Sequence, residues 1–354
     1  YIDKALMERN PALLLEGMAL AGYAVGAARG YVLARSEYPL SKPALDAAIA
    51  RAEQQGLLGD DILGSGFSFR VEVIEGAGSY VVGEETALLA SLMGLRGTVS
   101  ARPPFPAERG YLGLPTVVNN VETLCNIARH GAEAYAALSP GATPGSKLIC
   151  LNERFVRPGV YEVRFGVTVR EICEGLGGGL QDGAAIKALQ IGGPLAGILP
   201  GRLLDTPFDF GPLAAEGCML GHGGIVAFPE STDMRALARH LLRFGAHESC
   251  GKCFPCRIGL QRALELVEAP GSVDREQLEE LVAPGTTVLD PPSLAGRAGA
   301  RTVSEAVALT VDGTPLRVAP GTTVLEAARA AGLWVPTLCF DDRMAPFGAC
   351  RVCL

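Results

Sequence analysis

Hydrophobic and polar positions in the first part of the chain switch between helical and extended patterns. Two helices are predicted over 10–28 and 42–56, and two short strands over 30–35 and 67–74. The first helix opens with Asn10 as its N-cap and Pro11 at its first position. A third helix is predicted near Glu85. This alternation of helices and strands predicts the α/β fold class.

The pattern changes at about residue 145, where short strands, a Pro-Gly turn and one short helix predict a small β-rich, ubiquitin-like module. Helical spacing of apolar residues returns at 231–242. Further elements are predicted as helices at 258–269, 274–283 and 323–332, and as a strand, an Asp-Gly turn and a strand at 307–318. The heptapeptide APGTTVL occurs twice, at 283–289 and 319–325. Coincidence and a joining artefact are both open explanations.

Composition and charge exclude some functions. The 354 residues carry a net charge of −7 without basic runs, whereas nucleic-acid binding needs a concentrated positive face. The longest apolar stretch near the start, 17–28, is about a dozen residues, and a bilayer needs about 20. No signal peptide opens the chain, and the first residue is not Met. We therefore expect the interior of a longer sequence, truncated at both ends. Ten cysteines in such a chain favour metal ligands in a reducing, cytoplasmic compartment.

Three of the cysteines stand at strict intervals in ESCGKCFPCRIG: Cys250, Cys253 and Cys256. A zinc ribbon would need paired CxxC units separated by a longer span. A [4Fe–4S] cluster accepts three cysteines from one loop and a fourth from elsewhere. Lys252 and Arg257 would offset the charge of such a cluster. The spacing therefore predicts an iron–sulfur site.

A second group comprises Cys339, Cys350 and Cys353, which follow the predicted strand–strand–helix unit. A C-x10-C-x2-C spacing is typical of a [2Fe–2S] ferredoxin loop, with zinc as the alternative. The four remaining cysteines are scattered in apolar context and are predicted to be small core residues: Cys125, Cys150, Cys173 and Cys218.

Three motifs carry a family resemblance: GAGSYVVGEETALLASL, RPPFPAERGYLGLPTVVNNVETL and ESCGKCFPCRIG. Over 1–281 the chain resembles the NADH- and FMN-binding flavoprotein subunit of complex I. Related subunits occur in NAD-linked formate dehydrogenases and NAD-reducing hydrogenases. From about Val307 the chain is similar to the N-terminal [2Fe–2S] ferredoxin domain of the adjacent iron–sulfur subunit.

The resemblance implies five segments. They are an FMN- and NADH-binding α/β domain lacking its N-terminal part (1–140), a β-grasp module (141–229), a helical 4Fe-4S domain (230–283), a linker (284–305) and a truncated β-grasp ferredoxin-like segment (306–354).

The resemblance also implies which residues contact the cofactors FMN and NAD(H). Those expected to lie against the flavin or the nicotinamide are Tyr80, Gly83, Glu84 and Glu85. Those expected to hydrogen-bond the flavin or its phosphate chain are Val118, Asn119, Asn120 and Thr123. Arg102 would meet a nucleotide phosphate, at a position where the family commonly has Lys. Without the resemblance, Asn119 and Asn120 would be interpreted as an ordinary turn.

Two departures from the family stand out. The glycine-rich phosphate loop and the acidic nucleotide loop of the family lie upstream of residue 1, so we expect weak FMN binding. The fourth ligand of the first cluster is expected in a Ser-Leu-Cys context, but Ser293 and Leu294 are followed by Ala295. A three-cysteine site would hold [3Fe–4S] or take another ligand, for which His247 and His222 are candidates.

The implied function is NADH:acceptor oxidoreduction. Hydride passes from NADH to FMN, and single electrons then pass through [4Fe–4S] and [2Fe–2S] clusters to a partner subunit. No side chain is expected to act as acid or base. The implied partners are a thioredoxin-like 2Fe-2S subunit and a large iron–sulfur or molybdenum subunit, without direct membrane insertion. Complex I and formate dehydrogenase both remain open as the assembly. The alternative class is a non-catalytic iron–sulfur module that never binds NADH.

Overall fold

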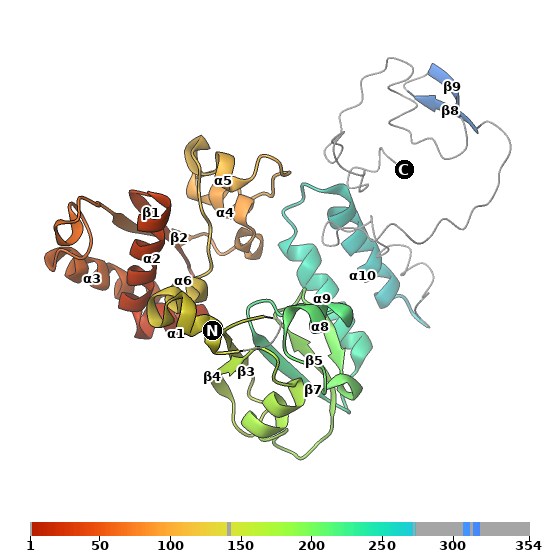
Figure 1. Ribbon diagram of the computed structural model, residues 1–354. Helices are drawn as coiled ribbons and strands as arrows, with labels where there is room; N and C mark the ends of the chain where they lie inside the picture. The colour runs from red at the N-terminus through yellow and green to blue at the C-terminus, as the bar shows by residue number, and fades with distance from the viewer. Residues whose placement is uncertain (1, 140–142, 272, 274–306, 312–313, 319–354) are drawn as a thin grey trace. The chain divides into compact units, whose positions relative to one another are not determined.

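The structure is a computed structural model that describes residues 2–139, 143–271, 273, 307–311 and 314–318. It has mixed α/β character (Figure 1). The chain divides into two compact units. The first unit comprises Tyr1–Ser79 and Val117–Asp233, and the second comprises Tyr80–Thr116 and Met234–Leu354.

The N-terminal part of the first unit is a two-stranded parallel sheet covered by helices (Figure 1). Its elements are α1 (Ile2–Arg9), α2 (Pro11–Val25), β1 (Arg29–Arg35), α3 (Ser41–Gln54), β2 (Arg70–Gly76), α6 (Val121–His130) and α7 (Ala132–Ala137). Strands β1 and β2 pair in parallel from Arg29↔Arg70 to Arg35↔Gly76. The helices and strands predicted here are confirmed, because their apolar faces form one buried core that includes Leu14 and Leu45.

The second part of this unit is a five-stranded sheet with its own core. Its elements are β3 (Ser146–Leu151), β4 (Gly159–Arg164), β5 (Ile186–Ile191), β6 (Ile198–Pro200), α8 (Phe210–Ala215) and β7 (Gly224–Pro229). The strand order is β4-β3-β7-β5-β6. Only the central pair β3 and β7 is parallel, and the other three pairs are antiparallel. The predicted short helix is a π-helical turn, Glu171–Leu176.

The second unit contains helices α4 (Glu85–Leu92), α5 (Pro106–Arg109), α9 (Met234–Glu248) and α10 (Leu260–Glu268), and strands β8 (Val307–Val311) and β9 (Thr314–Val318). Strands β8 and β9 pair antiparallel, which confirms the hairpin expected near the C-terminus. Helix α9 continues to Glu248, beyond the predicted 231–242, so it ends two residues before the first cysteine of the triplet.

Several predictions lie outside the described residues. They are the helices at 274–283 and 323–332, both copies of APGTTVL, the Ser293–Ala295 position and the second cysteine group. The segment boundaries remain predictions. Among the described helices, none is long and apolar enough to span a bilayer.

Candidate functional site

The cysteine triplet lies on the loop after α9 and on the π-helical turn Pro255–Gly259 that precedes α10. Gly251 has φ +76, a left-handed conformation that turns the chain away from α9. The backbone N–H of Gly251 donates to Ser249 Oγ at 3.2 Å. Pro255 lacks an N–H and cannot continue an ordinary helical ladder. The loop and the turn after it therefore depart from the α-helical conformation of α9.

The side chains around the thiols suit an anionic group. All three cysteines are partly exposed. The Oγ of Ser249 lies 3.4 Å from Cys256 Sγ. Lys252 Nζ donates to the Val99 carbonyl at 2.6 Å, and Arg257 Nη1 donates to the Gly251 carbonyl at 3.0 Å. Both predicted cations are therefore anchored at the loop, where they would offset the charge of a thiolate-bound cluster.

The thiols are not gathered around a single point. Within the described ranges, no three His, Cys, Asp or Glu side chains lie in a geometry that would hold one metal ion. One zinc ion draws its sulfur ligands to about 2.3 Å, whereas a cluster places its own irons and sulfides between the thiolates. His247 and His222, the candidate substitute ligands, are both exposed.

The first predicted nucleotide motif forms the 3-10 turn Tyr80–Gly83 and the start of α4, in the same unit. Glu84 is the N-cap of α4, and its carboxylate accepts from the backbone N–H groups of Thr86 and Ala87, both at 3.0 Å. Gly83 is exposed, and a Cβ added there would meet no heavy atom within 4 Å. Packing therefore does not explain a glycine at this position, and the open space fits a ligand approaching the backbone.

Arg102 is already paired. Its guanidinium forms an ion pair with Glu85 Oε1, and its Nη2 lies 3.9 Å from Glu84 Oε1. The side chain of Arg102 is 43% exposed and that of Glu85 is 31% exposed. A nucleotide phosphate would compete with Glu85 for this guanidinium from the solvent side.

The turn and the cysteine loop are joined inside the second unit. Glu248 Oε2 accepts from the Tyr80 backbone N–H at 3.0 Å. The Tyr80 ring packs edge-on against Phe244, with centroids 5.1 Å apart. Arg96 Nη2 donates to the Cys250 carbonyl at 3.2 Å. No role was predicted for Glu248 or Arg96 from the sequence. The one feature that could have drawn attention to Glu248 is its position in the motif ESCGKCFPCRIG, two residues before Cys250.

The second predicted flavin segment lies in the first unit. Asn120 is the N-cap of α6, where its Oδ1 accepts from the Glu122 N–H at 2.9 Å and its Nδ2 donates to Asp3 at 3.0 Å. Asn119 and Thr123 are exposed, and Val118 is half-buried. No hydrogen bond from the Asn119 side chain is present among the described residues. Asn120 is therefore committed to the helix, whereas Asn119 has an available amide.

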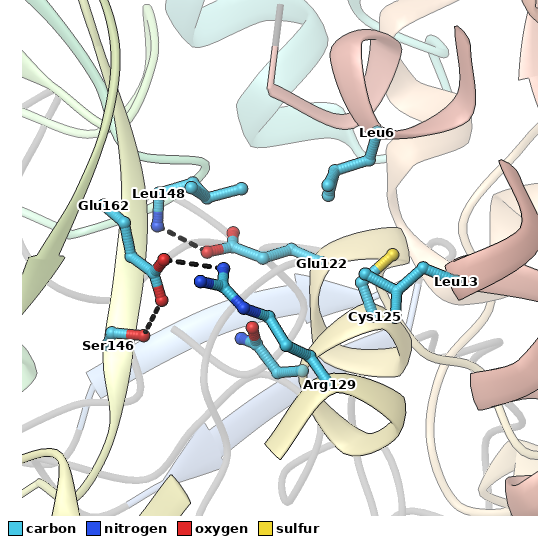
Figure 2. A pocket seen from close by; sticks show the side chains of 9 residues that line it. Leu6, Leu13, Glu122, Cys125, Arg129, Ser146, Leu148 and Glu162 are labelled. Atoms are coloured by element: carbon cyan, nitrogen blue, oxygen red, sulfur yellow. Dashed lines mark hydrogen bonds and ion pairs between the residues drawn. The ribbon is translucent and has the colours of Figure 1, made fainter. Parts of the chain in front are cut away.

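Glu122, which follows Asn120 closely, anchors α6 to the five-stranded sheet (Figure 2). Its buried carboxylate accepts from the Leu148 N–H at 2.6 Å and forms an ion pair with Lys147. Beside it lies a cavity of about 20 Å³, room for about one water molecule. Burial, with a smaller effect of nearby carboxylates, raises the pKa of the Cys125 thiol to about 11. Cys125 is thus a core residue beside this ion pair.

The other scattered cysteines are also mostly buried. Cys173 and Cys218 are buried, and Cys150 is half-buried on β3. The core prediction is therefore confirmed for Cys125, Cys173 and Cys218, and Cys150 lies at the edge of its core.

Comparisons with known proteins match three family models. Residues 1–129 match the Nuo51 FMN-binding domain, and residues 236–288 match the NADH-ubiquinone oxidoreductase-F iron-sulfur binding region. Residues 304–354 match a 2Fe-2S iron-sulfur cluster binding domain. The expected cofactors, FMN and two kinds of iron–sulfur cluster, are those of the matched domains.

Named relatives belong to larger assemblies. The NADP-reducing hydrogenase subunit HndC of Solidesulfovibrio fructosivorans is 43% identical over 79% of this chain and 58% of its own length. The NADH-quinone oxidoreductase F-type subunit numbered 2 of Rhizobium meliloti (strain 1021) is 44% identical over 79% of this chain and 69% of its own length. The F-type NADH-quinone oxidoreductase subunit of Escherichia coli (strain K12) is 44% identical over 81% and 67%, respectively.

A solved structure agrees with these relatives. The air-oxidized NAD+-reducing [NiFe]-hydrogenase matches with a TM-score of 0.65 and 35% identity, over 75% of this chain and 44% of that chain. The chain thus spans about half to two thirds of the proteins it matches. With the FMN-binding and iron–sulfur regions in the expected order, the chain belongs to the family of the F-type flavoprotein subunits of NADH-quinone oxidoreductase.

Proposed function

We propose that the chain is the NADH-oxidising, electron-transferring part of a multi-subunit redox complex. FMN, when bound, accepts hydride from NADH and releases the two electrons one at a time. Gly83 and Asn119 would contact the flavin or the nicotinamide, while Tyr80, Glu84 and Glu85 shape the turn that carries Gly83. Thr123 on α6 and Val118 in the segment before it would line the flavin, and Arg102 would bind a phosphate in exchange for its ion pair with Glu85.

Electrons would leave through the cysteine loop. Cys250, Cys253 and Cys256 would hold the first cluster, and Cys339, Cys350 and Cys353 would hold a [2Fe–2S] cluster. The proposed partners are a thioredoxin-like 2Fe-2S subunit and a large iron–sulfur or molybdenum subunit, in complex I or in a formate dehydrogenase or hydrogenase. A chain whose clustered cysteines are predicted to be cluster ligands rather than disulfide partners favours a cytoplasmic location.

We also propose the β-grasp assignment for the five-stranded module. Its support is the strand order, in which the first and last strands of the module, β3 and β7, are the parallel central pair. The module would serve as a spacer and would contact no cofactor.

The observation that supports an NADH-reactive flavin site best is Gly83. It is exposed at the end of the Tyr80–Gly83 turn, directly before the N-cap of α4, and open space lies where a side chain would be. A methyl group there costs the fold nothing, because no described atom is displaced, but it would stand between the backbone and a ligand.

The test is Gly83→Ala, with Gly211→Ala as the matched control because Gly211 also has no heavy atom within 4 Å of an added Cβ. Both variants should unfold at the wild-type urea concentration or slightly above it. In the chain carrying its natural flanking sequence, we expect Gly83→Ala alone to lose FMN retention and NADH-dependent flavin bleaching after anaerobic reconstitution. Equal bleaching in both variants would refute the role of Gly83. Iron–sulfur absorption with a wild-type chain inert to NADH would favour the non-catalytic module.

A further inference from the structure

Three side chains connect the turn-bearing segment of the second unit to the cysteine loop. Arg96 donates to the Cys250 carbonyl, Lys252 donates to the Val99 carbonyl, and Glu248 accepts from the Tyr80 backbone N–H. Of these contacts, only the one made by Glu248 reaches the Tyr80–Gly83 turn itself, the part of the segment proposed to meet the nicotinamide and flavin.

Glu248 lies at the end of a long helix. It is the last residue of the 15-residue helix α9, and it is half-buried. One turn earlier on the same helix, Phe244 packs against the Tyr80 ring with an interplanar angle of 80°. The final turn of α9 therefore holds Tyr80 by its backbone and by its ring, only two residues before Cys250.

Helix stability does not explain this carboxylate. The C-terminus of a helix carries partial negative charge, so an acidic residue there is electrostatically unfavourable. The compensating interaction is the charge-assisted hydrogen bond from Tyr80 N–H, at 3.0 Å. Its effect is to fix the turn in register with the loop that carries the cysteines.

We propose that Glu248 is a positioning residue for electron transfer: its carboxylate holds the Tyr80–Gly83 turn at a fixed distance from the cluster loop. The role rests on the proposed function. The affected step moves one electron from reduced flavin to an oxidised cluster, so that the flavin is oxidised by one electron, the cluster is reduced by one, and the flavin proton passes to solvent. The rate of electron tunnelling falls steeply as the separation between flavin and cluster grows. A turn that is no longer held at its position would therefore slow this step.

The test compares the wild-type chain with its natural flanking sequence, reconstituted anaerobically with iron, sulfide and FMN, with Glu248→Ala and Glu248→Gln in the same chain. The glutamine variant retains an oxygen that can accept from Tyr80 N–H. Glu265→Gln is the control, because Glu265 is an exposed residue of the same unit whose carboxylate pairs with neighbouring Arg262. Three readouts are taken: hydrogen–deuterium exchange of the peptide containing the Tyr80 amide, the electron paramagnetic resonance signal of the dithionite-reduced cluster, and the rate of cluster reduction after laser photoreduction of bound FMN.

We expect Glu248→Ala to keep its cluster signal, to exchange faster at Tyr80 and to slow cluster reduction several-fold, because the tunnelling rate falls exponentially with the separation between flavin and cluster. Glu248→Gln should restore both exchange and rate, and Glu265→Gln should match wild type. Wild-type rates in Glu248→Ala would overturn the role, whatever its exchange shows. Slow transfer in Glu248→Gln as well would also overturn it, because charge and not the hydrogen bond would then matter. A wild-type chain that binds no FMN would instead refute the proposed function itself.

Discussion

The ion pair between Glu122 and Lys147 provides the sharpest stability prediction. Its two side chains are 6% and 14% exposed, and it joins α6 to β3 across 25 residues of sequence. Replacing Lys147 by Met removes the positive partner and leaves the Glu122 carboxylate buried. Breaking a buried pair in this way costs about 3–5 kcal/mol.

The structure places the expected loss at the lower end of that range. Glu122 keeps its hydrogen bond from the Leu148 N–H at 2.6 Å, and the adjoining cavity can admit about one water molecule. We therefore expect a loss of about 3 kcal/mol in the free energy of unfolding. For a unit of this size that corresponds to a Tm lower by about 6–12 °C.

Urea unfolding followed by circular dichroism measures the effect. The matched control is Asp60→Asn, which breaks the exposed pair with Arg70 (77% and 56% exposed) and should cost about 0–1 kcal/mol. Adding Glu122→Leu to Lys147→Met removes the stranded charge and should recover part of the loss. If Lys147→Met costs no more than Asp60→Asn, the burial argument for this pair is wrong.

Three further predictions follow from individual contacts. Asn120→Ala should lower the free energy of unfolding, measured in urea, by about 1 kcal/mol because it removes the N-cap of α6. Asn119→Ala should leave this free energy unchanged and reduce FMN retention. Equal stability of the two variants would contradict the capping role of Asn120. Burial alone would raise the pKa of Glu162, but hydrogen bonding by Ser146 and the charge of Arg129 together hold this pKa below the ordinary 4.5. The ionised carboxylate therefore stabilises the fold above that pH, and this stabilisation is lost as the pH falls below it. Glu162→Gln should flatten the acid side of the pH–stability profile, and a profile as steep as that of wild type would refute this. On the native, cluster-free chain at neutral pH, iodoacetamide should alkylate Cys253 well before Cys125, whose thiol is buried with a pKa of about 11, as mass spectrometry would detect. Equal labelling of the two cysteines would contradict the burial of Cys125.

The sequence predicted the local features of the fold well. The helix at α2, the two short strands that follow it and the clustering of three cysteines on one loop follow from hydrophobic period, turn residues and cysteine spacing, all of which are local signals. The family motifs predicted an FMN-binding region followed by an iron–sulfur region, and the matches over residues 1–129 and 236–288 agree with that order.

The contacts that join distant segments could not be predicted. Glu248 and Tyr80 are 168 residues apart, and hydrophobic periodicity carries no information about such a pair. Glu122 lies in the motif VVNNVET, in which only the Val, Asn and Thr residues were assigned a role from the sequence. Its burial depends on the position of β3 beside α6, which the sequence does not reveal. In the same way, the capping role of Asn120 depends on where α6 begins, and the pairing of Arg102 depends on the approach of Glu85.

The most direct test of the account is whether the loop of Cys250, Cys253 and Cys256 holds an iron–sulfur cluster. The chain, with its natural flanking sequence and Cys350 replaced by Ser to disable the other group, is reconstituted anaerobically with iron and sulfide and analysed by metal content and low-temperature electron paramagnetic resonance. The account predicts bound iron and sulfide and a paramagnetic signal, both abolished by the further change Cys253→Ser. A colourless, iron-free chain, or a signal that survives Cys253→Ser unchanged, would contradict it.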